Sequence, residues 1–206
     1  MKNYSAISKP ILIPYGIDFV SFSDKNNFTD KSFIFVGRFS KNKNVSKLLK
    51  VAYYLKNRVP DFRLYMLGDG NERLDLEKMC KKFKLEKNVF FLGEKTGKSL
   101  LEYYKKSTFF LSASKYEGFG ISTLEAMASG CIVIVNDIEA FRNFVEKGKN
   151  GFLIDYSNPE KASEKIFEIM KRNDLEKISK NARELARTYD WKMLIKRIEK
   201  IYKEVI

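Results

Sequence analysis

Histidine is absent from the 206 residues of this chain, and cysteine occurs only twice. Because protein zinc sites are built mainly from these two residue types, the sequence argues against a zinc site. Cys80 falls in a predicted helix and Cys131 in a predicted buried strand, and nothing in the sequence requires a disulfide. Free thiols are typical of proteins in a reducing compartment, so we expect a cytoplasmic protein without a bound metal.

Long apolar runs are also missing. No stretch approaches the roughly 18 apolar residues that indicate a membrane-spanning helix, and residues 1–5 lack the apolar segment of a signal peptide. With 44% hydrophobic and 14% aromatic residues, the chain can still bury a substantial core. Its length suits one large domain or two small ones.

Acidic residues are too few to balance the basic ones, and the net charge is +13. The lysines are spread over most of the predicted helices, which is typical of solvated helix faces. No nucleic-acid-binding motif accompanies them, so we expect no nucleic acid partner. The charge better suits attraction to acidic phosphates, and it also allows peripheral contact with an anionic membrane surface.

Short apolar runs alternate with helical patterns along most of the chain. The runs predict six strands, at 32–36, 62–67, 88–92, 108–111, 131–135 and 151–154. Helices are predicted at 44–58, 71–83, 99–105, 139–146, 159–171, 175–187 and 191–205, besides a short one within 112–130. Continuous apolar strands that alternate with helices indicate an α/β fold, with a parallel sheet covered on both faces. Right-handed crossovers then give a doubly wound, Rossmann-like domain.

The most informative stretch is S-A-S-K-Y-E-G-F-G-I-S-T-L-E-A-M-A-S-G, residues 112–130. Gly118 and Gly120 form a predicted turn, and glycine lets backbone N–H groups approach a ligand closely. The helix that begins directly after the turn favours an anion at its N-terminus, most often a phosphate. Two nearby carboxylates, Glu117 and Glu125, would repel a phosphate and are better suited to bind hydroxyls. A phosphate next to a polyol describes a nucleotide sugar.

The same residues allow a purely structural interpretation. Ser122 and Glu125 have the spacing of a capping box, in which Ser122 caps the helix and Glu125 reaches back to it. Gly130 matches the glycine that follows the C-terminal end of such a helix. These residues leave both roles of Glu125 open, whereas Glu117 has no capping role.

Other polar candidates follow the ends of the predicted strands, which is where doubly wound sheets bind ligands. These candidates are Gly37-Arg38 after the first strand, Gly68-Asp69-Gly70 after the second, Gly93-Glu94 after the third and residues 117–122 after the fourth. Arg38 would clamp a diphosphate with its planar guanidinium, and Lys43 would act as a point charge. Both cations would stabilise a phosphate leaving group without a metal or another cofactor. The alternative is that Arg38 pairs with a surface carboxylate and Lys43 is solvated.

The run E-G-F-G-x-x-x-L-E-A-M-A-x-G, here residues 117–130, resembles the signature of retaining GT-B-fold glycosyltransferases of family 4, the glycosyl transferases group 1. Further blocks match this family in the right order, at residues 13–18, 35–40 with Lys43, 67–70, 89–93 and 151–154. The resemblance covers nearly the whole chain. It implies the C-terminal, donor-binding domain of such an enzyme.

The resemblance also implies roles for single residues. Arg38, Lys43 and Glu117 would form the catalytic group, with Glu117 at the hydroxyls of the donor sugar. Glu125 would bind the ribose diol, Gly93 and Glu94 the nucleobase, and the amides near residues 120–123 the diphosphate. The complete donor-binding set is Gly37, Gly93, Glu94, Gly118, Phe119, Gly120, Ile121, Ser122, Thr123 and Glu125.

By the same resemblance, residues 1–30 are an interdomain lead-in, 31–190 the nucleotide-sugar-binding domain and 191–206 a helix that crosses back onto an acceptor domain. That N-terminal acceptor domain is missing from this sequence. Either the chain is part of a longer enzyme, or a separate chain supplies the domain. In both cases we expect donor binding with little or no sugar transfer.

The last helix carries more apolar residues than one narrow stripe needs, so either a partner or its own domain would cover them. These residues are Met193, Leu194, Ile195, Ile198, Ile201, Tyr202, Val205 and Ile206.

The expected function is therefore transfer of a hexose from a nucleotide-diphosphate sugar to a glycan, lipid-linked or other acceptor, with retention and without an enzyme nucleophile. A non-catalytic nucleotide-sugar-binding module is the alternative. An epimerase of similar fold would need acid–base groups, often histidines, which this chain does not offer. A dinucleotide oxidoreductase is weaker still, because Gly68-Asp69-Gly70 is not a complete G-x-G-x-x-G motif.

Overall fold

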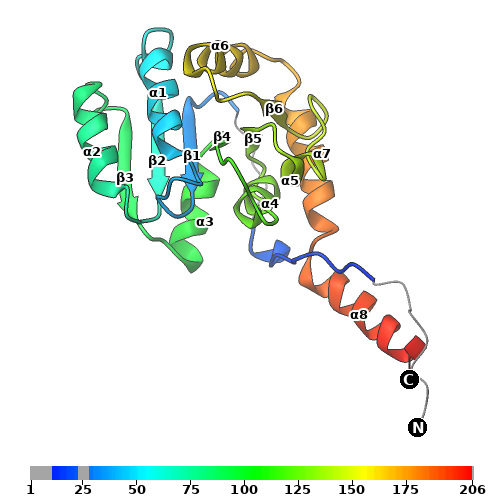
Figure 1. The fold of residues 1–206 in the computed structure, drawn as a ribbon. Coiled ribbons are helices and arrows are strands. Elements are labelled where there is room, and N and C mark those ends of the chain that lie inside the picture. The colour runs from blue at the N-terminus through cyan, green and yellow to red at the C-terminus, as the bar shows by residue number, and fades with distance from the viewer. Residues whose placement is uncertain (1–10, 23–27, 206) are drawn as a thin grey trace.

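The computed structural model of the chain describes residues 11–22 and 28–205, and it consists of one sheet with helices on both faces (Figure 1). The expectation for residues 1–5 lies outside the described residues, as do residues 1–10 and 23–27 of the predicted lead-in.

Six parallel strands form the sheet, in the order β3-β2-β1-β4-β5-β6. The strands are β1 (Ser32–Val36), β2 (Arg63–Leu67), β3 (Val89–Gly93), β4 (Phe109–Ser112), β5 (Ile132–Asn136) and β6 (Phe152–Ile154). All six agree with the predicted runs within one residue, so the predicted doubly wound sheet is confirmed. Because β1 pairs with both β2 and β4, the strand order reverses at β1. Doubly wound folds bind ligands at the carboxyl ends of the strands next to such a reversal.

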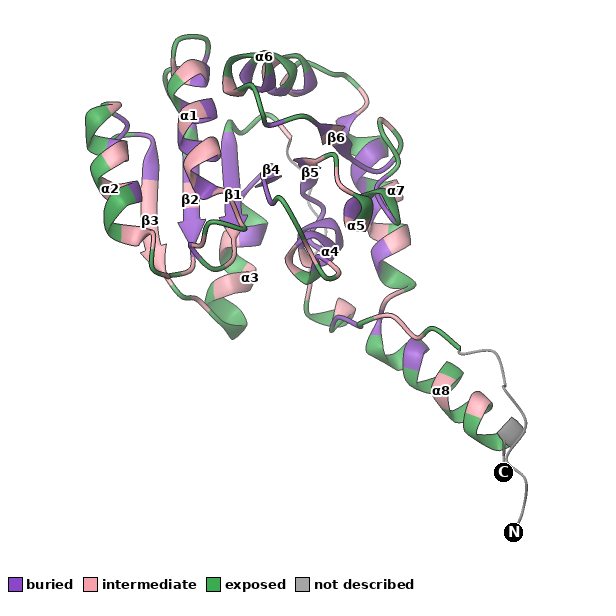
Figure 2. Cartoon of the chain, in the orientation of Figure 1, coloured by how far each residue is buried: buried purple, intermediate pink, exposed green. Residues whose placement is uncertain are grey.

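The helices are α1 (Val45–Lys56), α2 (Arg73–Lys82), α3 (Gly97–Lys106), α4 (Ile121–Ala128), α5 (Glu139–Arg142), α6 (Pro159–Met170), α7 (Leu175–Arg187) and α8 (Trp191–Val205). Alternate strand residues point to opposite faces of the sheet. Phe33 and Phe35 of β1 therefore join the core under α1, α2 and α6, whereas Ile34 joins the core under α3 and α4. Figure 2 shows the buried residues along the strands and on the sides of the helices that face the sheet. Neither Cys80 nor Cys131 forms a disulfide, and both are buried.

The predicted helix at 139–146 is shorter than expected and ends at Arg142. The side chain of Asn150, which is itself buried, takes the place of further helical hydrogen bonds. Its Oδ1 accepts a hydrogen bond from the Glu146 amide at 2.7 Å, and its Nδ2 donates to the Phe144 carbonyl at 2.9 Å. The chain therefore turns toward β6 instead of continuing as a helix.

Helix α8 projects away from the sheet, and its beginning is tied to the lead-in segment (Figure 1). The Ile17 amide donates to the Tyr189 carbonyl at 2.9 Å, and the Trp191 amide donates to the Ile17 carbonyl at 3.0 Å. Among the described side chains of this helix only Leu194 is buried, and Met193, Ile195 and Tyr202 are exposed. The alternative in which its own domain covers the apolar residues of α8 is therefore wrong for the described side chains, and Val205 and Ile206 lie outside that description.

No helix within the described part of the chain is long and apolar enough to cross a membrane. The cytoplasmic location and the peripheral membrane contact stay predictions.

Candidate functional site

Helix α4 begins with a glycine that no other residue would replace without strain. Gly120 is the N-cap and has a φ of 96°. A Cβ added there would lie 2.8 Å from a ring carbon of Phe141. The predicted capping box is wrong, because the helix starts at Ile121 and Ser122 lies inside its first turn. The carboxylate of Glu125 instead accepts a hydrogen bond from the Tyr104 hydroxyl at 3.0 Å.

The other end of α4 agrees with the sequence prediction. Gly130 has a φ of 75°, and its amide donates to the Met127 carbonyl at 3.0 Å. The Cys131 amide donates to the Ala126 carbonyl at 2.9 Å. This pair of hydrogen bonds is the Schellman motif, so Gly130 is confirmed as the residue that ends the helix.

Two amides at the start of α4 are available to a ligand. The Thr123 and Leu124 amides both donate to the Gly120 carbonyl, at 2.9 and 3.2 Å. No residue in the described chain accepts a hydrogen bond from the amide of Ile121 or Ser122. Thr123 therefore differs from the other predicted donor-binding residues of this turn, since its amide is already used and its side chain is only 1% exposed.

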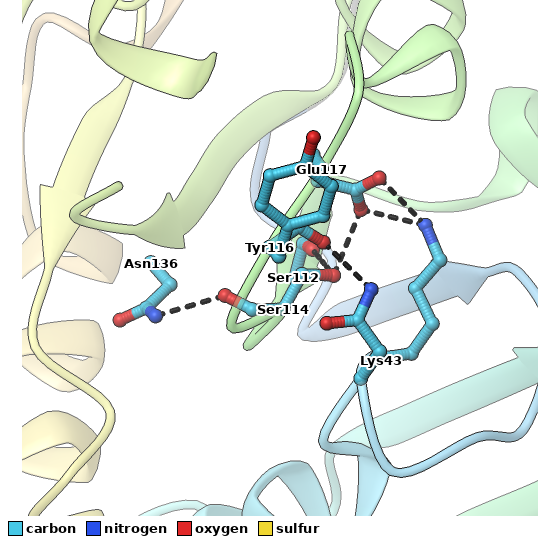
Figure 3. Close-up of polar contacts among 7 residues, drawn as sticks. Lys43, Ser112, Ser114, Tyr116, Glu117 and Asn136 are labelled. Carbon is cyan, nitrogen blue, oxygen red and sulfur yellow. Dashed lines mark hydrogen bonds and ion pairs between the residues drawn. The ribbon is translucent and has the colours of Figure 1, made fainter. Parts of the chain in front are cut away.

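A tight ion pair connects two of the predicted catalytic residues (Figure 3). The Lys43 Nζ lies 2.6 Å from Oε1 and 2.8 Å from Oε2 of Glu117. The two side chains are 24% and 10% exposed. The alternative in which Lys43 is solvated is therefore wrong.

Further hydrogen bonds hold Glu117 from behind (Figure 3). The Ser114 hydroxyl donates to Oε1 at 2.8 Å and lies 3.1 Å from the Ser112 hydroxyl. The Ser114 carbonyl in turn accepts a hydrogen bond from Nδ2 of Asn136, at the end of β5, at 2.9 Å. The position of the Glu117 carboxylate is thus fixed from two neighbouring strands, β4 and β5.

The loop that carries Arg38 rests directly on the loop that follows β2. A Cβ added at Gly68 would lie 2.0 Å from the Gly37 carbonyl oxygen, and one at Gly70 would lie 2.4 Å from the Phe39 carbonyl oxygen. The Phe39 amide donates to the Asp69 carbonyl at 2.8 Å. The glycines of the G-D-G motif therefore allow two backbones to touch, and this contact supports the Arg38 loop.

Arg38 itself is exposed, and no carboxylate in the described residues forms an ion pair with it. The alternative in which it pairs with a surface carboxylate therefore finds no partner in the described chain.

The predicted site residues line two adjoining hollows at the carboxyl ends of the strands. The first has a volume of about 440 Å³ and is lined by Arg38, Lys43, Glu117, Glu125 and the turn of residues 118–122, with Gly37 and Tyr15. The second, of about 490 Å³, shares Gly37 and Arg38 with the first and extends past residues 68–70 to Glu94. Gly93 and Thr123 line neither hollow. The Gly93 carbonyl accepts a hydrogen bond from the Gly68 amide at 2.9 Å, so this residue contributes to the support of the loops.

Burial changes the acidity of Glu125, which lines the first hollow, and of Tyr104, which contacts Glu125 from the core. It raises the pKa of Glu125, and the hydrogen bond from Tyr104 acts in the opposite direction. Burial and the nearby charge of Glu125 raise the pKa of Tyr104 well above its usual range. Tyr104 is therefore a protonated donor at neutral pH. Among the described residues, no three histidine, cysteine, aspartate or glutamate side chains gather closely enough to hold a metal ion.

Sequence reasoning missed the residues that support the site from behind. Tyr104 is one of two tyrosines in a predicted helix, and Ser114 and Asn136 are ordinary polar residues at strand ends. Only the spatial neighbourhood reveals their roles, since each acts on a residue that lies 3 to 22 positions away. Tyr15 was likewise placed in the lead-in and not in the site.

The fold and the site define a glycosyltransferase domain. The chain belongs to the glycosyl transferases group 1 family, whose model matches residues 18–185. Its fold is that of the C-terminal domain of GT-B enzymes. The structure of the C-terminal domain of a group 1 glycosyl transferase from Francisella tularensis superimposes with a TM-score of 0.74 and 25% identity, covering 85% of this chain and all of that one.

Other similar proteins carry more specific descriptions. The pneumococcal O-GlcNAc transferase GtfA, solved in complex with UDP and GlcNAc, superimposes with a TM-score of 0.78 and 25% identity over 94% of this chain and 38% of that one. An uncharacterized glycosyltransferase of Methanocaldococcus jannaschii is 28% identical over 84% of this chain and 48% of its own length. The poly(glycerol-phosphate) alpha-glucosyltransferase of Bacillus subtilis is 29% identical over 76% of this chain and 23% of its own. The chain thus spans at most about half the length of these curated relatives.

Proposed function

We propose that this chain is the donor-binding half of a retaining glycosyltransferase that transfers a hexose from a nucleotide-diphosphate sugar to a glycan, lipid-linked or other acceptor. The observation that carries the proposal is one hollow lined by two cations, two carboxylates and the amide-bearing start of a helix. Each of these groups suits one part of such a donor. The complex of the similar GtfA with UDP and GlcNAc supports this class of ligand.

The cations suit the diphosphate. Arg38 is exposed at the rim, and the free amides of Ile121 and Ser122 lie on another wall of the same hollow. During transfer the bond between the anomeric carbon and the phosphate oxygen breaks, and its electron pair stays on that oxygen. Arg38 and Lys43 would stabilise the negative charge that develops there, which is the role that we propose in place of a metal ion. The acceptor hydroxyl loses its proton to the leaving phosphate as the new bond forms on the same face of the sugar.

The carboxylates suit the hydroxyls at the two ends of the donor. Glu117 is held by Ser114 as well as by Lys43. If the phosphate takes over Lys43, the carboxylate therefore stays in place for the hydroxyls of the sugar. Glu117 precedes the turn of residues 118–122, and Glu125 follows it on α4. Glu125 would accept hydrogen bonds from the ribose diol. Glu94, on the wall of the second hollow, would lie near the nucleobase.

The acceptor side is proposed to lie outside these 206 residues, either in a longer form of the chain or in a separate chain. The exposed apolar side chains of α8 and of the lead-in, among them Trp191, Met193 and Leu12, are suited to contact such a domain. The second candidate function, a nucleotide-sugar-binding module without catalysis, follows from the same division. Measurable sugar transfer by the purified chain alone would contradict both the division and the second candidate.

A thermal-shift panel tests the proposal. The chain is heated with UDP-, GDP- and ADP-sugars, each with magnesium and with a chelator. A donor at 100 times its dissociation constant stabilises a protein by about 2.7 kcal/mol, so we expect one nucleotide class to raise the melting temperature, with and without magnesium. A shift that needs magnesium would contradict the metal-independent part of the proposal.

Variants then test the site. We expect Arg38→Ala and Glu125→Gln to reduce the rise in melting temperature. The matched controls, Arg63→Ala and Glu86→Gln, change exposed residues and should leave that rise unchanged. An unchanged shift in both site variants would remove these residues from the donor site.

A further inference from the structure

Tyr104 is a core residue whose hydroxyl contacts the candidate site. Its side chain, on α3, is completely buried against the second core. The hydroxyl donates to Oε2 of Glu125 at 3.0 Å and lies 3.2 Å from the backbone carbonyl of Ser122. One buried group therefore contacts both the first turn of α4 and the carboxylate that follows it.

The hydrogen bond from Tyr104 gives the two oxygens of the Glu125 carboxylate different surroundings. Tyr104 binds Oε2, whereas no donor among the described residues is bound to Oε1. Glu125 also lines the first hollow. One oxygen is thus anchored from the core side, and the other keeps its capacity to accept a hydrogen bond from a ligand.

We infer that Tyr104 is a positioning residue for nucleotide recognition, because its hydroxyl holds the Glu125 carboxylate so that the free oxygen accepts a hydrogen bond from a ribose hydroxyl of the donor. The inference deepens the proposed function and depends on it. Its new content is that ribose recognition extends to a residue that itself touches no ligand.

Packing alone does not explain this hydroxyl. A phenylalanine ring would fill the same space, and a buried hydroxyl is unfavourable unless it forms a hydrogen bond. Tyr156 shows the ordinary solution, since this equally buried tyrosine lies under the other face of the sheet and donates to the Ile134 carbonyl at 2.8 Å. Tyr104 differs because it also contacts an ionisable side chain of the site. This difference makes Tyr156 a matched control.

The experiment measures dissociation constants for the nucleoside diphosphate that the panel identifies among UDP, GDP and ADP, and for its 2′-deoxy and 3′-deoxy analogues. The proteins are the parent chain, Tyr104→Phe, Tyr156→Phe and Glu125→Gln. We expect Tyr104→Phe to weaken binding of the ribonucleotide by about five- to tenfold. For the analogue that lacks the hydroxyl bound by Glu125, the same variant should change the affinity by less than about twofold. Tyr156→Phe should leave all affinities unchanged, although it also loses a buried hydrogen bond.

A second measurement separates positioning from a general loss of structure. The ionisable groups that share the first hollow with Glu125 are Tyr15, Arg38, Lys43 and Glu117. Its contact from α3 is Tyr104, whose backbone carbonyl accepts a hydrogen bond from the Cys131 thiol. Loss of the Tyr104 hydroxyl removes a donor that favours the charged carboxylate. The pH below which ribonucleotide affinity declines should therefore be higher in Tyr104→Phe than in the parent chain. A loosened core would not produce such a shift.

The outcomes distinguish the two levels of the proposal. If Glu125→Gln binds ribonucleotide and deoxy analogues like the parent chain, or if no nucleotide binds, the proposed site fails and the inference fails with it. If Glu125→Gln loses ribose discrimination but Tyr104→Phe keeps both the discrimination and the pH profile, only the inference is overturned. If Tyr104→Phe weakened the binding of the ribonucleotide and of both its deoxy analogues equally, the inference would also be overturned, because the role of Tyr104 would then be structural.

Should Tyr104→Phe fail to fold, Glu125→Asp replaces it. This variant keeps the tyrosine and the charge but withdraws the carboxylate by one methylene group. Unchanged ribose discrimination in Glu125→Asp would overturn the inference, and its loss would support it.

Discussion

The ammonium group of Lys43 and the carboxylate of Glu117 meet at 2.6 Å although the two residues are 74 positions apart. Lys43 lies between β1 and α1, and Glu117 lies between β4 and α4. The pair therefore connects the loops of two neighbouring strands, β1 and β4, at the point where the strand order reverses. The lysine that we assign to a phosphate and the glutamate that we assign to a sugar are thus bound to each other in this structure.

This pairing leads to a prediction for Glu117→Gln. The substitution removes the anion that competes with phosphate for Lys43, so the nucleoside diphosphate alone should bind more tightly, by up to about fivefold. The corresponding nucleotide sugar should gain less or lose affinity, since its hydroxyls lose a charged acceptor. Calorimetric titration with both ligands measures the difference. The control is Glu86→Gln, at an exposed position that lines neither hollow. Equal changes for both ligands in Glu117→Gln would contradict the assigned roles.

The contact between the β1 and β2 loops predicts a large effect of Gly68→Ala. The new methyl group would lie 2.0 Å from the Gly37 carbonyl oxygen, and Gly68 has a φ of 135°. We expect the free energy of unfolding to fall by about 2–4 kcal/mol, with weaker nucleotide binding because the Arg38 loop must move. Denaturant titration provides the measurement.

The control for Gly68 is Gly97→Ala. Gly97 also has a positive φ, of 53°, but no atom lies within 4 Å of the added Cβ. We therefore expect Gly97→Ala to lower the free energy of unfolding by only about 1 kcal/mol. Similar losses in the two variants would show that backbone strain, and not the contact between the loops, decides the effect.

Glu125 predicts a pH dependence that its glutamine variant lacks. Burial raises its pKa above the usual value of a glutamate, which is about 4.3. At pH values between the usual pKa of the unfolded chain and the raised pKa of the folded chain, the folded chain binds more protons. The free energy of unfolding should therefore decrease as the pH rises through this interval. In Glu125→Gln this contribution is absent, so the stability difference between the two proteins should shift in favour of the variant with rising pH. Thermal unfolding at several pH values measures it, and parallel curves would contradict the prediction.

A substitution at Gly16 should have a local effect on the fluorescence of Trp191, the single tryptophan of the chain. A Cβ at position 16 would lie 2.6 Å from the ring of Trp191, at the start of α8. We expect Gly16→Ala to displace the ring, to shift its fluorescence to longer wavelength and to make α8 more accessible to proteases. Gly118→Ala is the control, because nothing lies within 4 Å of its added Cβ. Unchanged emission in Gly16→Ala would show that the lead-in does not hold Trp191.

The strands and most helices could be predicted because their patterns are local. The apolar runs 32–36 and 131–135 are continuous, and a strand buried on both faces needs such a run. The end of α5 was missed because a side chain eight residues beyond it, Asn150, satisfies the backbone in its place. The start of α4 was misplaced because a left-handed Gly120 serves as the N-cap, whereas the spacing of Ser122 and Glu125 imitated a capping box.

The site was predictable to the extent that strand ends gather at one edge of the sheet. This rule placed Arg38 and Glu117 together, the family resemblance added Lys43 and Glu125, and the structure has all four on one hollow. It did not indicate that Lys43 and Glu117 are paired, that the Thr123 amide is already used or that Gly93 supports a loop. Those features depend on interatomic distances that no sequence pattern encodes, because they are set by how neighbouring loops pack.

The reversal of strand order at β1 divides the walls of the site between two structural units. One wall, with Gly37, Arg38 and Glu94, belongs to the β1–β3 unit, and the other, with Glu117 and Glu125, belongs to the β4–β6 unit. Each unit builds its wall from its own loops, and the ion pair of Lys43 with Glu117 is a polar bond between them. The loop that we assign to the base could therefore be exchanged between related enzymes while the loop that we assign to the sugar is kept, so the division offers a natural boundary for chimeric transferases.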